Sequence, residues 1–257
     1  MRNIRIRVAY DGSCFYGWQR QAGFLSVQQA LEESIEAVCG QRVNVYGSGR
    51  TDTGVHALGQ VANFHLDTTL TDLRLRAALN AHLRPGAAVK DVETCADDFH
   101  AQRSACGKRY LYVIRNSRVR PVHALQLAHW TPLKLDFEAM RAAGPAFVGE
   151  HDFSSMASSG SPRKSNIRRV HSLQVRRQGD TYWFMIQGSG FLYNMVRTIA
   201  GTLMQAGRGK LDRPAIEGIL RSRERSLAGP TAPAAGLYLV RVLYGEEMAW
   251  DGRSARS

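Results

Sequence analysis

Apolar and polar residues alternate with the period of a β-strand at several points of this chain, and helical patterns separate these stretches. Residues 3–10 alternate from the start, and residues 62–66 do so again. Such alternation is typical of strands with one buried face. Residues 27–38 instead have apolar side chains three and four apart, which predicts a helix. The order of strand, helix and strand indicates a mixed α+β fold.

Local capping signals mark the ends of the predicted helices. Ser26 and Gln29 have capping-box spacing before the first helix, and Gly40 is expected to end it. A second helix is predicted over residues 71–82 and stops before Pro85. These two helices and the strands around them form one α+β unit.

A comparable succession of elements begins again after about residue 105. Residues 108–114 and 181–187 alternate as strands, and Asp136 opens a helix between them that ends before Pro145. The other predicted elements are a helix with Leu192, Val196, Ile199 and Leu203 in register, a helix opened by Asp212, and a strand at 237–240.

We therefore predict an α+β fold of two similar halves, each a mixed or antiparallel sheet with helices on one face. The N-terminal half spans residues 1–104, the C-terminal half spans 105–245, and 246–257 form a tail. The halves share an order of elements and no close sequence repeat. Residues 154–166 are rich in Ser, Gly, Pro and basic residues, which predicts a mobile loop.

The charge of the chain indicates a polyanionic partner. Its 257 residues include 34 Lys and Arg against 22 Asp and Glu, a formal net charge of +12. Most of the excess is arginine, whose guanidinium binds phosphate in a bidentate way. Nucleic acid is the leading partner by this criterion. The alternative, a basic surface with no such partner, stays open on charge alone.

No run approaches the ~20 apolar residues that span a membrane. The alternating N-terminus has a strand pattern and lacks that of a signal peptide. The four cysteines are widely spaced, with no C-x-x-C pair, so we expect no metal site and no disulfide framework. Reduced thiols in the cytoplasm fit this usage best.

Residues 47–57 carry an acidic side chain in a glycine-lined turn. Asp52 lies between Gly49 and Gly54, two residues after Arg50, within a strongly basic protein. This setting is typical of a reactive carboxylate. It is equally typical of a β-turn in which the aspartate bonds only its own backbone. The local sequence does not decide between the two. Nucleotide-binding glycine loops and the serine-hydrolase and zincin motifs do not occur.

Two further residues could belong to such a site or only to the core or surface. Tyr110 follows Lys108 and Arg109 on a predicted strand, where an aromatic residue usually belongs to the core. The alternative is a base-stacking platform or proton acceptor flanked by phosphate-binding cations. Arg197 lies on an otherwise apolar helix. It extends to the surface, or it turns inward and then requires a carboxylate partner.

Five ordered motifs together resemble the tRNA pseudouridine synthase A family. The central one is Arg50-Thr51-Asp52-x-Gly54-Val55-His56-Ala57. The other four are Tyr10-Asp11-Gly12 with Phe15-Tyr16-Gly17-Trp18-Gln19, Lys108-Arg109-Tyr110-x-Tyr112, Phe191-Leu192-Tyr193-Asn194-Met195-Val196-Arg197, and Thr231-Ala232-Pro233-Ala234-x-Gly236-Leu237. They span the chain to about residue 245.

The resemblance implies a role for each site residue. Asp52 matches the catalytic aspartate, Tyr110 the tyrosine that stacks on the target uracil and takes the C5 proton, and Arg197 the partner of the aspartate. It also implies a homodimer that uses no cofactor and converts uridines 38 to 40 of the tRNA anticodon stem-loop to pseudouridine. In this family two α+β halves flank a basic central cleft.

The cations near these motifs are expected to bind RNA: Arg50, His56, Lys108, Arg109, Arg163 and Lys164. Met156 departs from the family pattern, because an aromatic residue is expected there, and residues 154–166 resemble the family only loosely.

Two other functions compete with this reading. A non-catalytic RNA-binding or ribosome-associated protein would share the charge and the aromatic strands. It would have no use for a carboxylate in a basic cleft, so the position of Asp52 relative to Tyr110 and Arg197 discriminates between them. A pseudouridine synthase for another RNA would share the chemistry and differ only in its substrate.

Overall fold

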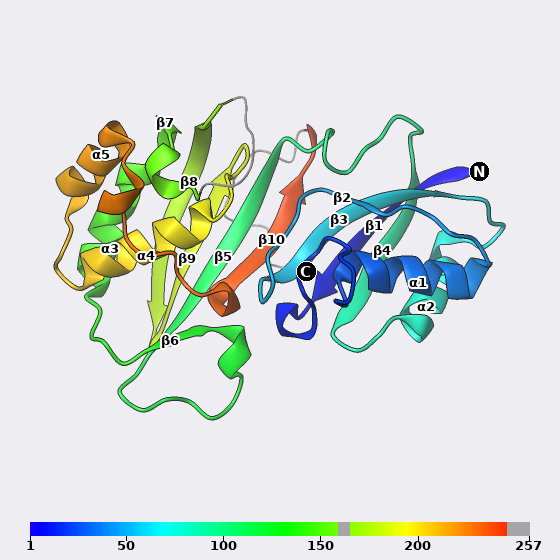
Figure 1. Ribbon diagram of the computed structural model, residues 1–257, viewed down its shortest axis with the longest axis horizontal. Helices are drawn as coiled ribbons and strands as arrows, with labels where there is room; N and C mark the ends of the chain where they lie inside the picture. The colour runs from blue at the N-terminus through cyan, green and yellow to red at the C-terminus, as the bar shows by residue number, and fades with distance from the viewer. Residues whose placement is uncertain (159–164, 246–257) are drawn as a thin grey trace.

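One mixed sheet of ten strands runs through the whole molecule in the computed structural model, which describes residues 1–158 and 165–245 (Figure 1). The strand order is β4-β1-β3-β10-β5-β9-β8-β7, with β2 beside β3 and β6 beside β5. The strands are β1 Arg2–Tyr10, β2 Tyr46–Gly47, β3 His56–Leu66, β4 Ala87–Cys95, β5 Gly107–Asn116, β6 His129–Thr131, β7 Gly149–Asp152, β8 Ile167–Gln178, β9 Thr181–Gly188 and β10 Leu237–Leu243.

Five α-helices accompany the sheet in the described part of the chain: α1 Val27–Cys39, α2 Asp72–His82, α3 Phe137–Ala143, α4 Met195–Gly207 and α5 Arg213–Ser222. The predicted caps are confirmed for α1, because the Ser26 side chain accepts from the Gln29 amide and Gly40 takes a left-handed conformation. Asp136 and Asp212 likewise cap α3 and α5. No helix in residues 1–158 or 165–245 is long and apolar enough to cross a membrane.

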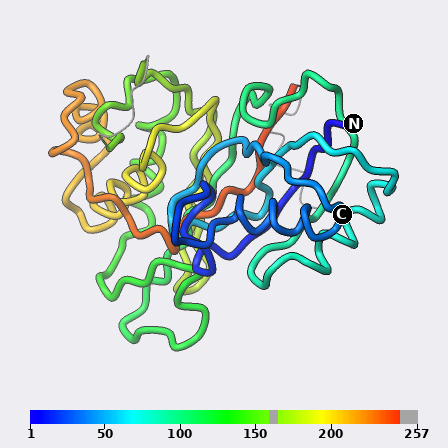
Figure 2. The backbone as a smooth tube through the Cα atoms, turned by 45° about the vertical axis from the view of Figure 1, so that its right-hand side comes forward, coloured from blue at the N-terminus to red at the C-terminus, as the bar shows by residue number. Residues whose placement is uncertain are grey.

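The α+β fold is confirmed, whereas the expectation of one sheet in each half is wrong. β10 pairs in parallel with β3 and antiparallel with β5, so it joins the strands of both halves. Figures 1 and 2 show the N-terminal segments in blue to cyan and the C-terminal segments in green to orange, on either side of the red β10. The last strand in the described part of the chain, β10, thus joins the two halves.

A row of paired residues crosses the sheet on the face that the helices cover. Tyr10 pairs with Ala57, Ala57 with Leu239, Leu239 with Tyr110, and Tyr110 with Ile186. Directly paired residues point to the same side of a sheet. On the N-terminal side this row packs with the apolar faces of α1 and α2, and on the C-terminal side with those of α3, α4 and α5. The middle of the row lies between the two groups of helices.

Two elements differ from the prediction: α4 begins later than expected, and β3 is more deeply buried. Leu192 was expected within a helix, but α4 begins at Met195 because Asn194 takes a left-handed backbone with φ of 60°. β3 was expected to be half buried, yet most of its residues are buried on both faces. Asn63 donates to Asn3 Oδ1 and accepts from the Ala101 amide, which holds the 96–101 loop over the face opposite the helices.

Candidate active site

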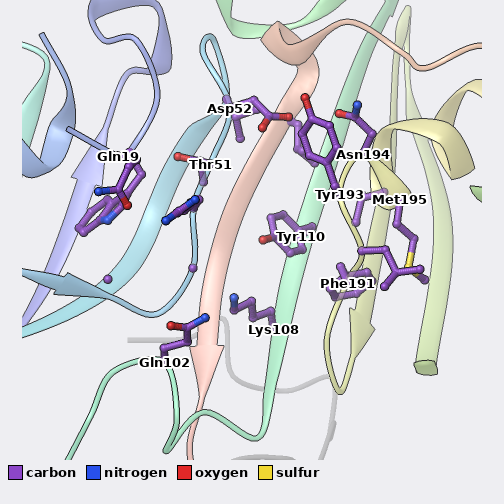
Figure 3. Close-up of a pocket in the computed structure, with 18 of the residues that line it drawn as sticks. Gln19, Thr51, Asp52, Gln102, Lys108, Tyr110, Phe191, Tyr193, Asn194 and Met195 are labelled. Atoms are coloured by element: carbon purple, nitrogen blue, oxygen red, sulfur yellow. The ribbon is translucent and has the colours of Figure 1, made fainter. Parts of the chain in front are cut away.

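A pocket of about 940 Å³ lies over the middle of the sheet, between the helices of the two halves. Its walls come from the loops after β1 and β2, from β5, and from the turn that precedes α4. Asp52, Tyr110 and Arg197 all line it, although they lie in three separate parts of the chain. Figure 3 shows Asp52, Tyr110 and Lys108 following one another along the pocket. Both halves are therefore needed to form it.

The turn that carries Asp52 is held at its two ends. The Val55 amide donates to the Asp52 carbonyl oxygen at 3.1 Å, and Gly54 has a φ of +80°, which favours glycine. Ser48 and Gly49 come just before this turn and are bound by Gln60, which accepts a hydrogen bond from Ser48 Oγ and donates one to the Gly49 carbonyl oxygen. The Asp52 carboxylate stays 34% exposed toward the pocket. The backbone is thus fixed while the acidic group remains accessible.

The loop after β1 holds the Asp52 turn in place through contacts with Thr51. The Trp18 amide donates to the Thr51 carbonyl oxygen at 3.0 Å, and the Tyr10 hydroxyl lies 2.8 Å from Thr51 Oγ1. Gly17 packs so closely that a Cβ there would lie 2.6 Å from the Thr51 carbonyl oxygen. Thr51 is thus held by three residues of the motif at residues 10–19. These contacts explain in physical terms why that motif and the motif at residues 50–57 occur together.

Arg197 binds Asp52 directly. Its Nη1 donates to Asp52 Oδ2 at 3.1 Å and to Asn194 Oδ1 at 2.9 Å, while Nε donates to the Ala232 carbonyl oxygen at 2.7 Å. The arginine side chain is 18% exposed, so the inward orientation considered from the sequence is the one observed. With three acceptors around it, the guanidinium has one defined position from which it orients the carboxylate.

The first turn of α4 depends on the conformation of Asn194. An Asn side chain tolerates the left-handed region better than most residues, and here it also donates to Ser158 Oγ at 3.0 Å. The chain therefore turns sharply into α4 and places Arg197 in the first turn, pointing toward the pocket. The last motif meets the helix here, because Ala232 pairs with Arg197 through both its amide and its carbonyl group.

Tyr110 forms part of the pocket wall beside Asp52. Its ring meets Phe191 edge to face, with centroids 5.2 Å apart, and it contacts the apolar cores of both halves. Burial raises the pKa of the Tyr110 hydroxyl above its usual range, and Tyr10 and Asp52 shift it in the same direction. At neutral pH the group is a neutral phenol. It combines a flat stacking surface with a hydroxyl that can donate or relay a proton.

Lys108 lies next to Tyr110 on the same face of β5. Its Nζ donates to the Ser48 carbonyl oxygen at 3.0 Å. Burial lowers the pKa of this ammonium to about 8. Arg50 is exposed at the pocket edge, and His100 and Gln102 reach the same edge from the loop before β5. This part of the pocket is therefore cationic and polar.

Two of the predicted RNA-binding residues lie outside the pocket. His56 is 2% exposed, stacks on Tyr238, and lies 2.8 Å through Nε2 from the Gln126 carbonyl oxygen. Arg109 points to the other face of β5 and donates to Gln187, because neighbouring strand residues alternate. Arg163 and Lys164 lie outside the described residues.

Sequence reasoning missed Gln60 and Asn194 as supports of the site. Gln60 stands between Leu58-Gly59 and Val61-Ala62, and a polar amide within such an apolar run is a signal in the sequence, since buried amides require partners. Asn194 lies three residues before Arg197, the spacing at which side chains meet on a helix. All four cysteines lie in the described residues, and none of them forms a disulfide there.

Comparisons with known proteins found sequence relatives along nearly the whole chain. A protein-family model described as tRNA pseudouridine synthase matches residues 6–102 and 143–245, which include Asp52 and Arg197. A protein of Acetivibrio thermocellus called tRNA pseudouridine synthase A is 44% identical over 244 residues, covering 95% of this chain and all of that protein. Proteins with the same name from Thermoanaerobacter sp. strain X514 and Geotalea daltonii are 42% and 44% identical, again over 95% of this chain and the full length of each relative.

Proposed function

This chain belongs to the tRNA pseudouridine synthase A family, isomerases of uridines in the anticodon stem-loop, and from that premise we propose that it acts on positions 38, 39 and 40 of tRNA. The observation that carries the proposal is the Asp52–Arg197 pair, 3.1 Å apart in a pocket lined also by Tyr110. A non-catalytic RNA-binding protein has no use for such a carboxylate, because it would repel phosphate.

Asp52 is the catalytic group in this proposal. Pseudouridine formation breaks the C1′–N1 bond, turns the base, and joins C5 to C1′. A carboxylate can attack an electron-poor sugar carbon or stabilise its positive character, as in glycosidases. Arg197 and Asn194 would hold Asp52 in one orientation, so that less entropy is lost on reaching the transition state. The overall reaction needs no oxidant or reductant, because the product is an isomer of the substrate, and we propose that it uses no cofactor.

Tyr110 has two proposed tasks. Its ring offers a stacking surface to a uracil that has left the RNA stack, which offsets part of the cost of unstacking. Its hydroxyl is a neutral phenol at neutral pH. To take the proton from C5 it must therefore pass its own proton on, which makes it a relay. The pocket encloses the base while it turns and limits the entry of water.

The RNA-binding surface is proposed to centre on the pocket edge. Arg50 and Lys108 line the pocket and would contact phosphate or base, whereas His56 and Arg109 would act indirectly, through Gly12 and Gln187. Roles for Arg163 and Lys164 rest on the family resemblance alone.

The two proposed halves, residues 1–104 and 105–245, would flank the pocket as a basic central cleft. Leu239 of β10 packs in the N-terminal core and Val55 in the C-terminal core, so the halves share their packing. We also propose a homodimer that acts in the cytoplasm, where its tRNA substrate is found. Light scattering of the purified protein tests the dimer; a monomeric mass at micromolar concentration would contradict it.

Tritium release from C5-labelled uridine in a tRNA transcript tests the activity. We expect release from a transcript with uridine at positions 38 to 40, and none from a matched transcript with cytidine there. Equal release from both transcripts would assign the enzyme to other uridines. Absence of release from any RNA would overturn the proposed function.

A further inference from the structure

A partly buried cation in the pocket has no acidic partner in the described part of the chain. Lys108 Nζ forms no ion pair there, and the Ser48 carbonyl oxygen is its one hydrogen-bond acceptor among these residues. An ammonium group has three N–H donors. Partial burial of an unpaired cation is costly unless a ligand completes its surroundings. The site thus has the form of a binding position for an anion or a polarised carbonyl oxygen.

Lys108 is positioned to contact the base and not only the backbone of an RNA. It lies two residues before Tyr110 on β5, so the two side chains share one face at a spacing of about 7 Å. Figure 3 places Tyr110 between Asp52 and Lys108. A uracil that stacks on Tyr110 with its sugar at Asp52 would therefore extend one edge toward the ammonium group.

The reaction itself produces an anion at this point. When the C1′–N1 bond breaks, its electron pair stays on the base, because the sugar carbon is the partner that supports positive character. If Asp52 attacks C1′, an ester bond forms as the C1′–N1 bond breaks, and the carboxylate's negative charge passes to the uracil. That charge is shared by N1, O2 and O4. When C5 later bonds to C1′, the carboxylate leaves with its electron pair and the C5 proton moves to N1.

We propose that the Lys108 ammonium donates a hydrogen bond to a carbonyl oxygen of the detached uracil and stabilises its negative charge while the base turns. This role rests on the proposed function, since it requires cleavage of the C1′–N1 bond. It makes Lys108 a catalytic residue in addition to Asp52 and Tyr110. The lowered pKa agrees with an ammonium that is incompletely solvated before the base arrives.

A purely structural role for Lys108 fits the contacts less well. The turn at Ser48 and Gly49 is already held by Gln60, which accepts from Ser48 Oγ at 2.7 Å and donates to the Gly49 carbonyl oxygen at 2.8 Å. The backbone of this turn also pairs with Val61, since the Ser48 amide donates to the Val61 carbonyl oxygen. Loss of the ammonium group should therefore leave the turn in place.

The first test separates chemistry from binding. Lys108→Met removes the charge and every donor, Lys108→Gln keeps a neutral donor, and Lys134→Met is the control that removes an exposed lysine outside the pocket. We expect Lys108→Met to bind tRNA within about threefold of wild type. Its single-turnover rate should fall about 10²- to 10³-fold, the usual effect of losing one donor to a developing anion. The single-turnover rate of Lys108→Gln should fall by most of the same factor, and that of Lys134→Met should hardly change.

The outcomes distinguish the alternatives. A wild-type rate for Lys108→Met overturns the proposal. A loss confined to tRNA affinity also overturns it, and assigns Lys108 to a phosphate. A full rate in Lys108→Gln assigns it to holding the Ser48 turn. Failure of the wild-type protein to form pseudouridine at all would instead refute the proposed function.

A pH profile provides a readout that a structural role would not move. Arginine stays protonated where the lysine loses its proton, so the rate of Lys108→Arg relative to wild type should rise above pH 8. A ratio that stays flat from pH 7 to pH 9.5 would contradict the proposal. The other titratable or charged groups that line this pocket are present in both proteins, and their titration cancels in the ratio: Tyr46, Arg50, Asp52, His100, Tyr110, Tyr193 and Arg197.

Discussion

Gly17 and Gly23 form a matched pair that tests how the first motif supports the Asp52 turn. Both have left-handed backbones, with φ of +75° and +80°. A Cβ on Gly17 would lie 2.6 Å from the Thr51 carbonyl oxygen, whereas a Cβ on Gly23 would have no atom within 4 Å. Alanine at either position carries the same backbone strain. Only alanine at position 17 also pushes on the turn that carries Asp52.

The expected magnitudes follow from these distances. Left-handed alanine costs about 1–2 kcal/mol, which applies to both variants. An ordinary contact would require the Thr51 oxygen and the new methyl group to separate by about a further 0.8 Å, and overpacking of this kind costs about 1–3 kcal/mol. Gly17→Ala should therefore lower the melting temperature by roughly twice as much as Gly23→Ala. For a chain of this size, 1 kcal/mol corresponds to about 2–4 °C.

The effect on activity should be more selective than the effect on stability. A displacement approaching 1 Å at a catalytic group costs about 10²-fold in rate. We expect Gly17→Ala to lose about 100-fold in single-turnover pseudouridine formation, and Gly23→Ala to stay near wild type. Thermal unfolding by circular dichroism and rapid-quench assays below the melting temperature measure the two effects. Equal rates for both variants would refute the view that the loop after β1 positions Asp52.

Three further substitutions probe the pocket. Tyr110→Phe keeps the stacking ring and should bind tRNA normally while tritium release from C5 falls at least tenfold; an unchanged release rate would remove the hydroxyl from the mechanism. Arg197→Met leaves Asp52 and the Ala232 carbonyl oxygen without their donor, so the single-turnover rate should fall about 10²-fold and the free energy of unfolding by about 1–3 kcal/mol; a wild-type rate would show that the ion pair is incidental. Lys108 has a folded-state pKa of about 8, below its usual 10.5, so the unfolded state binds more protons between these values and this lysine's contribution to stability rises with pH there. In urea unfolding, the unfolding free energy of wild type should accordingly rise relative to that of Lys108→Met from pH 8 to pH 10.5, by up to about 3 kcal/mol; a constant difference between the two proteins would exclude the lowered pKa of Lys108.

Elements with local signals could be predicted from the sequence. The caps of α1, α3 and α5 are short side-chain contacts between residues three apart, and each occurs as predicted. β8 has no such signal, because basic residues alternate irregularly along Ile167–Gln178. It forms a strand through pairing with β7 and β9. Parallel pairing of β10 with β3 joins segments about 180 residues apart, and no local pattern encodes it.

The site shows the same division between local and long-range information. Asp52 could be recognised as a turn aspartate, but its partner lies 145 residues further along the chain. In the sequence, only the order of the five motifs links Asp52 to Arg197. Alternation along β5 determines that Lys108 and Tyr110 enter the pocket while Arg109 does not. A cluster of adjacent cations in the sequence is thus divided between two faces of the sheet.

The role of Asp52 is tested most directly by mapping pseudouridine in tRNA treated with purified wild-type protein and with Asp52→Asn. The amide has nearly the same size and can still accept from Arg197, so the variant should fold and bind tRNA within about threefold of wild type. We predict pseudouridine at positions 38 to 40 with the wild-type protein and none with Asp52→Asn. Product at those positions at a rate close to wild type in the variant would contradict a catalytic role for this carboxylate.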